Sequence, residues 1–225
     1  MEHHVVSKKR VEDHGEVYTR AREVNAMLDL VKQETERIES RFLEPACGTG
    51  NFLVEVLRRK LEVVTSRYRR SQLEYERYAV LAVSSIYGID ILEDNVTACR
   101  NRLFYLFEEY YLSRFQRKAK KECLATVKFI LGRNIIHGDA LTLQTVGKNP
   151  QSIIFSEWSF VKGSMIKRRD FTFQQLLTPD EQKQITLFNS SKTQKSDTGK
   201  YIFIPEPVKD YPLTHFLRVA DAECP

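Results

Sequence analysis

The stretch that decides the fold is "FLEPACGTGNF", residues 42–52, in which a short apolar run leads through a proline into two glycines. The run has the length of a short buried strand, and an amphipathic segment begins at Asn51. Gly48 and Gly50 can adopt positive φ, and they leave the backbone bare. Two interpretations are open. The loop binds a small molecule with a polar edge, or it is a tight strand-to-helix turn without a ligand.

Outward from this loop, apolar residues alternate between the spacing of strands and the spacing of helices. We expect strands over residues 41–46, 86–91, 134–141 and 152–158, and helices over residues 22–38, 51–64, 66–84, 94–115 and 120–131. Strands that alternate with helices indicate βαβ units, and therefore an α/β fold with a mainly parallel sheet.

The pattern fades after residue 178. The segments 170–177 and 200–205 are apolar enough to add one or two strands, whereas 189–200 is polar enough for a loop or linker. We therefore predict a domain over residues 41–178, preceded by a helical segment over 1–40 and followed by a polar linker and tail over 179–225.

Two acidic residues mark the ends of the next strands. In a parallel sheet, ligands bind in the crevice at the carboxyl ends of the strands. Asp90 ends the second expected strand, where it could accept hydrogen bonds from ribose hydroxyls, or could instead cap the helix that follows. Asp139 ends the third. Because the glycine loop and these acids follow the strands in order, the sequence predicts a site for a nucleotide-like ligand.

Composition limits the class of protein. The chain has 225 residues, of which 42% are hydrophobic and 29% charged, so it can bury a sizeable core. Its longest apolar run is far shorter than the roughly 20 residues of a membrane span, and its start lacks the apolar stretch of a secretory signal. The cysteines lie far apart, which favours neither disulfides nor a metal site. These features predict a soluble, cytoplasmic, reduced protein that has no metal and does not enter a membrane.

The formal net charge is +5 and is carried in basic patches along the chain. Such patches favour binding to a phosphate backbone. Acidic residues are interleaved with most of them, however, and mixed charge is also typical of solvated helix faces. Charge alone therefore leaves nucleic-acid binding open.

Four motifs together resemble a known family. "FLEPACGTGNFL" is similar to the cofactor loop of S-adenosylmethionine-dependent methyltransferases, and its E-P-A-C-G-T-G-N form resembles the adenine-N6 DNA methyltransferases of restriction–modification systems. "YGIDI" is similar to the second box of that family, "GDAL" to the third, and "HGEVYTRAREVNAMLDLV" to the box that covers the methionine end. The resemblance spans roughly residues 13–158. It implies a modification (M) subunit with a Rossmann-like class I methyltransferase fold, incomplete at its C-terminal end.

The resemblance also implies S-adenosylmethionine as the cofactor and assigns residues to it. The glycine loop would surround the methionine and sulfonium, Asp90 would hold the ribose, Ile91 would pack on the adenine ring, and Asp139 would bond the adenine amine. The residues implied to bind the cofactor are Tyr18, Thr19, Glu44, Pro45, Ala46, Gly48, Gly50, Asn51, Asp90, Ile91, Asp139 and Ala140.

Methylation of an exocyclic amine requires the target base to leave the duplex and enter a pocket. Where the family has a [DNS]-P-P-[YFW] box, this chain reads "FSEWS", residues 155–159, without the proline pair. As candidate catalytic residues, Ser156 or Glu157 could accept from the amine, and Trp158 could stack on the base. Alternatively, Trp158 anchors the core and its two neighbours are loop residues.

Two functions from different classes follow. In the first, the chain is an adenine-N6 DNA methyltransferase subunit that works on DNA with a partner protein, which completes the fold or supplies target recognition. In the second, it is a non-catalytic S-adenosylmethionine-binding subunit with a regulatory or scaffolding role. Methylation of RNA, protein or a small molecule on the same fold is a third possibility, because fold does not determine substrate.

Overall fold

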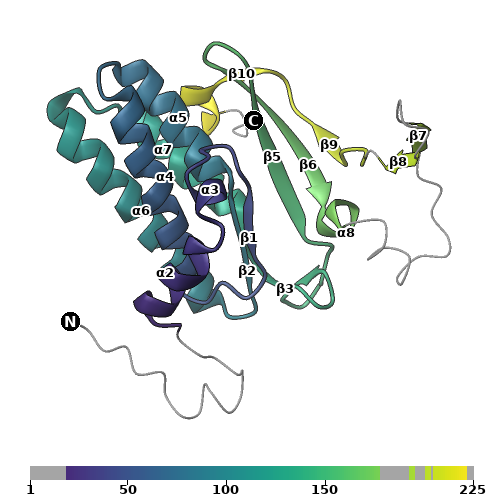
Figure 1. Cartoon of the computed structure of the whole chain (residues 1–225). Coiled ribbons are helices and arrows are strands. Elements are labelled where there is room, and N and C mark those ends of the chain that lie inside the picture. Colours follow the sequence, from purple (N-terminus) through teal and green to yellow (C-terminus); the bar gives the residue numbers. More distant parts are fainter. Residues whose placement is uncertain (1–18, 178–192, 196–200, 204, 222–225) are drawn as a thin grey trace.

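The structure, a computed structural model, describes residues 19–177, 193–195, 201–203 and 205–221. Its elements form layers: a group of helices, a mainly parallel sheet beside it, and an antiparallel sheet on the far side (Figure 1). This arrangement is a mixed α/β fold, as the alternation of strands and helices predicts.

The first sheet contains the strands that follow the sequence prediction. β1 (Phe42–Glu44), β2 (Ile86–Asp90) and β3 (Ile135–Asp139) run parallel, and β4 (Gln144–Thr145) adds antiparallel to β3 in the order β1-β2-β3-β4. The carboxyl ends of the three parallel strands therefore meet at one edge. Among the described residues β1 pairs only with β2, so its other edge is open.

Each connection between parallel strands is a helical hairpin. α4 (Asn51–Tyr68) and α5 (Gln72–Ser84) join β1 to β2, while α6 (Glu93–Phe115), the 3-10 turn η1 (Gln116–Lys118) and α7 (Lys121–Asn134) join β2 to β3. The four helices pack on one another and on the sheet, and their buried apolar side chains form the main core.

The hairpins are longer than the sheet requires. At 1.5 Å per residue α4 is about 27 Å long and α6 about 34 Å, whereas a five-residue strand such as β2 spans about 17 Å. Both hairpins therefore project past the end of the sheet opposite the glycine loop.

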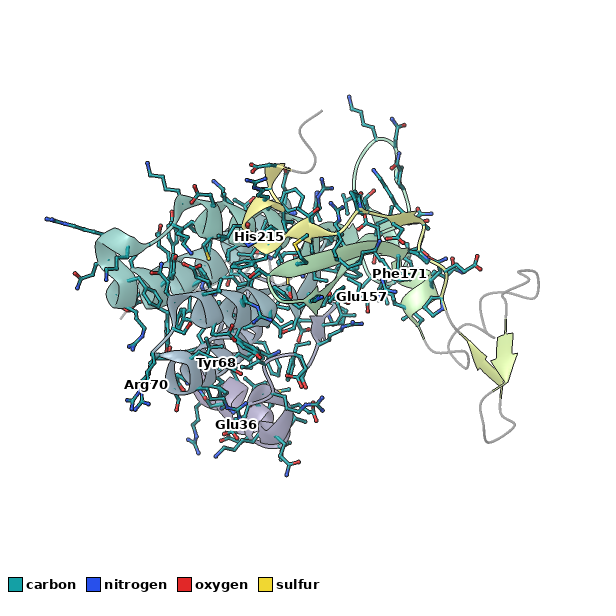
Figure 2. All side chains as sticks on the ribbon, turned by 90° about the horizontal axis from the view of Figure 1, so that it is seen from above. Glu36, Tyr68, Arg70, Glu157, Phe171 and His215 are labelled. Atoms are coloured by element: carbon teal, nitrogen blue, oxygen red, sulfur yellow. The ribbon has the colours of Figure 1, made fainter. Side chains whose placement is uncertain are left out.

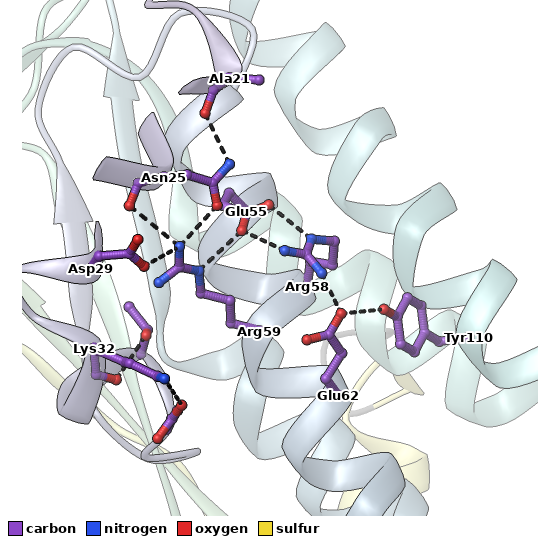
Figure 3. A network of polar contacts seen from close by, with 11 residues as sticks. Ala21, Asn25, Asp29, Lys32, Glu55, Arg58, Arg59, Glu62 and Tyr110 are labelled. Atoms are coloured by element: carbon purple, nitrogen blue, oxygen red, sulfur yellow. Dashed lines mark hydrogen bonds and ion pairs between the residues drawn. The ribbon is translucent and has the colours of Figure 1, made fainter. Parts of the chain in front are cut away.

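The N-terminal segment forms two short helices, α2 (Ala21–Asp29) and α3 (Lys32–Thr35), where one helix is expected over 22–38. Val24 and Leu28, one turn apart on α2, are buried against α4. Arg59 on α4 donates to the Asn25 side chain at 2.9 Å and pairs with Asp29 at 2.8 Å, which holds α2 in place (Figure 3).

The second sheet corrects one expectation. Residues 152–158 were expected to form a fourth strand of the parallel sheet, but β5 (Ile154–Lys162) pairs antiparallel with β6 (Met165–Thr172) in a separate sheet. The two-residue connection between β5 and β6 allows only an antiparallel pair, because parallel neighbours need a long crossover. The polar residues of β6 are compensated within this pair. Arg168 and Asp170 on β6 neutralise each other at 2.8 Å and both bond the Ser156 hydroxyl of β5, so a polar-looking strand can be buried. The expected extra strand over 170–177 ends at Thr172, where α8 (Phe173–Leu176) begins with a capping box.

Segments near the C-terminus also pair. β7 (Thr193–Lys195) and β8 (Tyr201–Phe203) form a two-stranded ribbon, so a strand does form within 200–205, and three residues of the expected loop 189–200 are extended. β9 (Lys209–Asp210) and β10 (Thr214–His215) pair with β6, and Phe216, in the 3-10 turn η2 (Phe216–Arg218), is buried in the main core. The domain boundaries at residues 40 and 178 stay a prediction. None of the described helices is long and apolar enough to cross a membrane.

Candidate functional site

The glycine loop lies over the carboxyl end of β2. Cys47 donates its N–H to the Ile89 carbonyl at 2.9 Å, and Gly50 donates to the Cys47 carbonyl at 2.8 Å. Gly48 and Gly50 have φ of 51° and 86°, in the left-handed region that favours glycine. Gly50 precedes α4, whose first N–H groups therefore face the same crevice.

The Asp90 carboxylate holds this loop in place. Its Oδ2 accepts from the Gly48 N–H at 2.8 Å, and its Oδ1 accepts from the Leu92 N–H at 2.9 Å and the Asn95 side chain at 3.2 Å. The side chain is almost fully buried. Asp90 thus links the ends of β1 and β2 and the start of α6, and of the roughly four acceptor positions of a carboxylate these bonds leave about one.

One face of α6 supports the loop from below. Asn95, Cys99 and Arg102 have the i, i+4, i+7 spacing of a single helix face. The Arg102 guanidinium donates to the Thr49 carbonyl and the Asn51 side chain, both at 2.7 Å. No sequence motif marks these three residues, and the only signal that predicts them is their common spacing on one face of α6.

Two buried thiols lie beneath the glycines. A Cβ added to Gly50 would meet the Cys99 Sγ at 2.6 Å, and one added to Gly88 would meet the Cys47 Sγ at 3.1 Å. The neighbouring Cys99 thiol and burial both raise the pKa of Cys47, so it remains a protonated thiol. Both cysteines therefore act as small packing residues that allow the loop and β2 to approach α6 and α4 closely.

Most of the predicted cofactor residues gather at this edge. Glu44 ends β1 and is half-buried, and Pro45 and Ala46 are exposed beside it. The Thr19 carbonyl accepts from the Asn51 side chain at 3.3 Å, so the start of α2 lies against the loop. Tyr18 lies outside the described residues.

The ends of β2 and β3 carry the remaining predicted residues. Ile91 follows β2 with half of its surface exposed, and its carbonyl contacts the His137 ring at 3.0 Å. Asp139 ends β3, followed by the half-buried Ala140. The Leu141 N–H, 2.9 Å from the Asp139 carboxylate, holds the pKa of that carboxyl below its usual value.

Glu44 differs electrostatically from Asp139. Burial raises the pKa of the Glu44 carboxyl, and the Ala46 N–H opposes part of this rise. A cation placed beside Glu44 would oppose this rise, because an opposite charge favours the ionised form. The carboxyl ends of β1 and β3 thus offer two acids whose pKa values are shifted in opposite directions.

The three candidate catalytic residues lie apart from this edge. Ser156 is buried and donates to Asp170 at 2.7 Å, and Trp158 is 5% exposed and donates its ring N–H to Asn134 at 3.0 Å. Glu157 pairs with Arg41 and, at 2.9 Å, with Arg169. These contacts favour the alternative in which Trp158 anchors the core. Ser156 and Glu157 lie within β5 and not in a loop.

Glu157 and Ser156 do line a cavity of about 280 Å³ between the two sheets. Figure 2 places Glu157 and Phe171 close together at this part of the molecule. The rest of the cavity is lined by Arg41 and by apolar or aromatic side chains. These are Leu43, Tyr87, Phe155, Phe171, Phe173, Leu176 and Leu177. The cavity is close to the size of small-molecule pockets, which begin near 300 Å³. Within the described ranges, no group of histidines, cysteines and acids could hold a metal ion.

The fold and the geometry of the glycine loop together define the class of protein to which the chain belongs. A glycine loop between a parallel strand and a helix, tied to an acid at the next strand end, is the arrangement of α/β domains that bind a ligand at the carboxyl ends of their strands.

Comparison with known families gives the particular family. The family model described as "MmeI, DNA-methyltransferase domain" matches residues 18–197, and the chain belongs to this family. The resemblance to the DNA methyltransferases of restriction–modification systems is thereby confirmed. No curated protein and no solved structure matches the chain.

Proposed function

We propose that this DNA-methyltransferase domain binds S-adenosylmethionine at the carboxyl ends of β1, β2 and β3, and that it methylates the exocyclic amine of adenine in DNA together with a partner polypeptide. The observation that carries the proposal is the bond between the Gly48 N–H and the Asp90 carboxylate. It joins the loop to the acid that would receive the ribose.

The residues at this edge fit the cofactor. A Cβ at Gly48 would meet no atom within 4 Å, so a ligand can approach the backbone there. Asp90 keeps about one acceptor position for a ribose hydroxyl, and the exposed Ile91 offers an apolar surface for the adenine ring. The half-buried Glu44 carboxylate would face the positive sulfonium, whose methyl group is what the cofactor supplies.

Tyr18, Thr19, Pro45, Ala46, Asn51, Asp139 and Ala140 complete the proposed cofactor site. Thr19 and Asn51 would close the methionine end, because they already contact each other. Asp139 would accept from the adenine amine, and its lowered pKa keeps it ionised for that purpose.

A partner polypeptide is proposed for the second half of the site. Ser156 and Trp158 are bonded inside the protein, and Glu157 is held between Arg41 and Arg169. Because all three lie apart from the cofactor edge, Glu157 could accept from the target amine only after a rearrangement that frees it from an arginine and brings it toward that edge. The unpaired edge of β1 would take a further strand, because an edge presents unpaired backbone N–H and C=O groups.

The same contacts favour a second candidate function, a non-catalytic subunit that binds S-adenosylmethionine and regulates or supports a catalytic partner. The two functions share the cofactor site and differ only in methyl transfer. In both, the cofactor-binding edge of this chain is essential.

A methyl-transfer assay distinguishes the two candidate functions. The full chain, alone and with any co-purifying polypeptide, is incubated with methyl-labelled cofactor and mixed-sequence DNA, and label in adenine is measured. Transfer that requires the partner supports the first function, and cofactor binding without transfer in either preparation supports the second. Gly50→Val is the control, since its side chain would collide with Cys99 and disrupt the loop. Absence of cofactor binding by the folded wild-type chain contradicts both.

A further inference from the structure

The tips of the two helical hairpins lie side by side. The α4–α5 turn and the α6–α7 connection are joined by a bond from the Arg114 guanidinium to the Arg69 carbonyl at 2.7 Å. A second bond, at 2.8 Å, runs from the Gln72 side chain to the Lys118 carbonyl. The two tips, called here the hairpin tips, therefore form one surface.

The two chain segments that form this surface are basic. No acidic residue occurs between residues 67 and 73 or between residues 110 and 121. Figure 2 shows the Arg70 side chain pointing outward from the helical layer. The exposed cations of the hairpin tips are Arg67, Arg69, Arg70, Arg114, Arg117, Lys118 and Lys121.

Several cations elsewhere on the same helices form ion pairs with acidic residues of the chain. Arg58 pairs with Glu55 at 2.6 Å and with Glu62 (Figure 3), and Arg77 pairs with Glu74 at 2.7 Å. Lys120, between the tips and the core, pairs with the buried Glu76 at 2.7 Å. By contrast, no carboxylate of the described residues forms an ion pair with a hairpin-tip cation. Their charge is left for an external anion.

A regular array of phosphates suits such a surface best. Each phosphate that a cation neutralises releases a condensed counterion, and this release gives favourable binding that falls steeply with salt. Long flexible arginines and lysines at the ends of projecting hairpins can follow a backbone without reading bases.

We propose that the hairpin tips bind the phosphate backbone of duplex DNA without sequence preference. The contact lies apart from the cofactor edge, because α4 begins at the glycine loop and ends at the tips, about 27 Å away. At 3.4 Å per base pair this distance corresponds to roughly eight base pairs. The hairpin tips would therefore bind duplex DNA several base pairs away from the target base, and not the target itself.

The test measures binding of a fluorescein-labelled duplex of arbitrary sequence to the full chain over a range of salt concentrations. The variant Arg69→Ala/Arg70→Ala/Arg117→Ala/Lys118→Ala removes four cations of the tips. Each phosphate contact contributes about 0.9 to the slope of log affinity against log salt, so the slope should fall by about 3 if most of these cations contact phosphates.

The matched control is Lys128→Ala/Lys148→Ala/Lys162→Ala/Arg218→Ala, which removes the same charge from exposed positions elsewhere. Its slope should change by less than about 1, because lost net charge alone releases no bound counterions. Equal melting temperatures of both variants and wild type check that all are folded, as exposed substitutions predict.

Equal loss of slope in both variants, or no loss in the tip variant, would overturn the proposal. A competition arm uses polyglutamate at matched charge concentration. If polyglutamate displaces the duplex from the wild type as well as unlabelled DNA does, the tips fit an acidic protein and not DNA. The readout does not require cofactor binding or methyl transfer, so it stands whether or not the proposed function holds.

Discussion

Asp90 has a structural task beside its proposed role toward the ribose. Its carboxylate accepts from a backbone N–H of the loop, from the Leu92 N–H and from Asn95. A residue expected from sequence to face a ligand therefore also determines the shape of the loop that would bind it.

Asp90→Ala should lower both stability and cofactor affinity. The substitution leaves the Gly48 N–H without its acceptor, which costs about 1–3 kcal/mol of the free energy of unfolding. For stability alone the comparison is Asp139→Ala, whose carboxylate accepts from the Leu141 N–H of its own turn and whose loss should cost less. Urea unfolding and calorimetric titration with S-adenosylmethionine measure the two effects. A wild-type unfolding midpoint together with wild-type affinity would refute the role of Asp90.

Gly50→Ala and Gly132→Ala should act in opposite directions. At Gly50, φ is 86°, and holding alanine in this left-handed conformation costs about 1–2 kcal/mol of stability. The new Cβ would also lie 2.6 Å from the Cys99 Sγ, which adds to the loss. At Gly132, inside α7, the new Cβ would meet nothing within 4 Å, and alanine should add about 0.4–1 kcal/mol. Thermal unfolding of the two variants decides the matter. Equal shifts would show that the loop tolerates side chains.

The residues that hold the loop were only partly predictable from sequence. The glycines and Asp90 belong to short motifs whose chemistry can be recognised locally. Asn95, Cys99 and Arg102 are spread over two turns of a helix with mixed composition, and their role depends on how α6 packs under the loop. Nothing local in the sequence distinguishes such supporting residues from an ordinary helix face.

Among the elements, the three parallel strands and their helices were predictable because their periodicity is strong. The pairing of β5 was not, because an apolar strand reads the same in a parallel and in an antiparallel sheet. Its partner β6 contains "KRRDFT", which reads as a surface segment until Arg168 and Asp170 are seen to neutralise each other.

Trp158 packs β5 against α7. Its ring lies edge-on to Phe129 at 6.2 Å and donates to Asn134. Trp158→Ala should therefore cost about 3–5 kcal/mol of stability, while the molecules that remain folded keep their cofactor affinity. Tyr105→Ala, an aromatic truncation at an exposed position of α6, is the control and should change stability by no more than about 0.5 kcal/mol. Loss of DNA methylation with an unchanged melting temperature would instead restore Trp158 as a base-stacking residue.

For the whole molecule, a buried lysine links stability to pH. Lys60 is fully buried and donates to the Ile38 and Ser40 carbonyls and the Ser85 hydroxyl, where the N-terminal segment meets the sheet. Burial lowers the pKa of Lys60 from its usual 10.5 to about 7. Between these values the unfolded chain binds the proton and the folded chain does not, so stability should rise with pH.

Lys60→Met should remove this rise. The measurement is the free energy of unfolding of wild type and variant at pH values from about 5 to about 11, and their difference isolates Lys60 from other titrating groups. The expected difference grows in favour of the wild type as pH increases and is constant below pH 7. A difference that does not depend on pH would show that the ammonium stays charged, held by its three acceptors.

Both proposed functions require that this edge of the parallel sheet binds S-adenosylmethionine, and calorimetric titration of the full chain with that compound measures this binding. We expect saturable binding by the wild type that Gly50→Val abolishes, while Gly132→Ala, a glycine substitution away from the loop, leaves it unchanged. A folded wild-type chain that takes up no cofactor, or a Gly50→Val variant that binds it as the wild type does, would refute both functions.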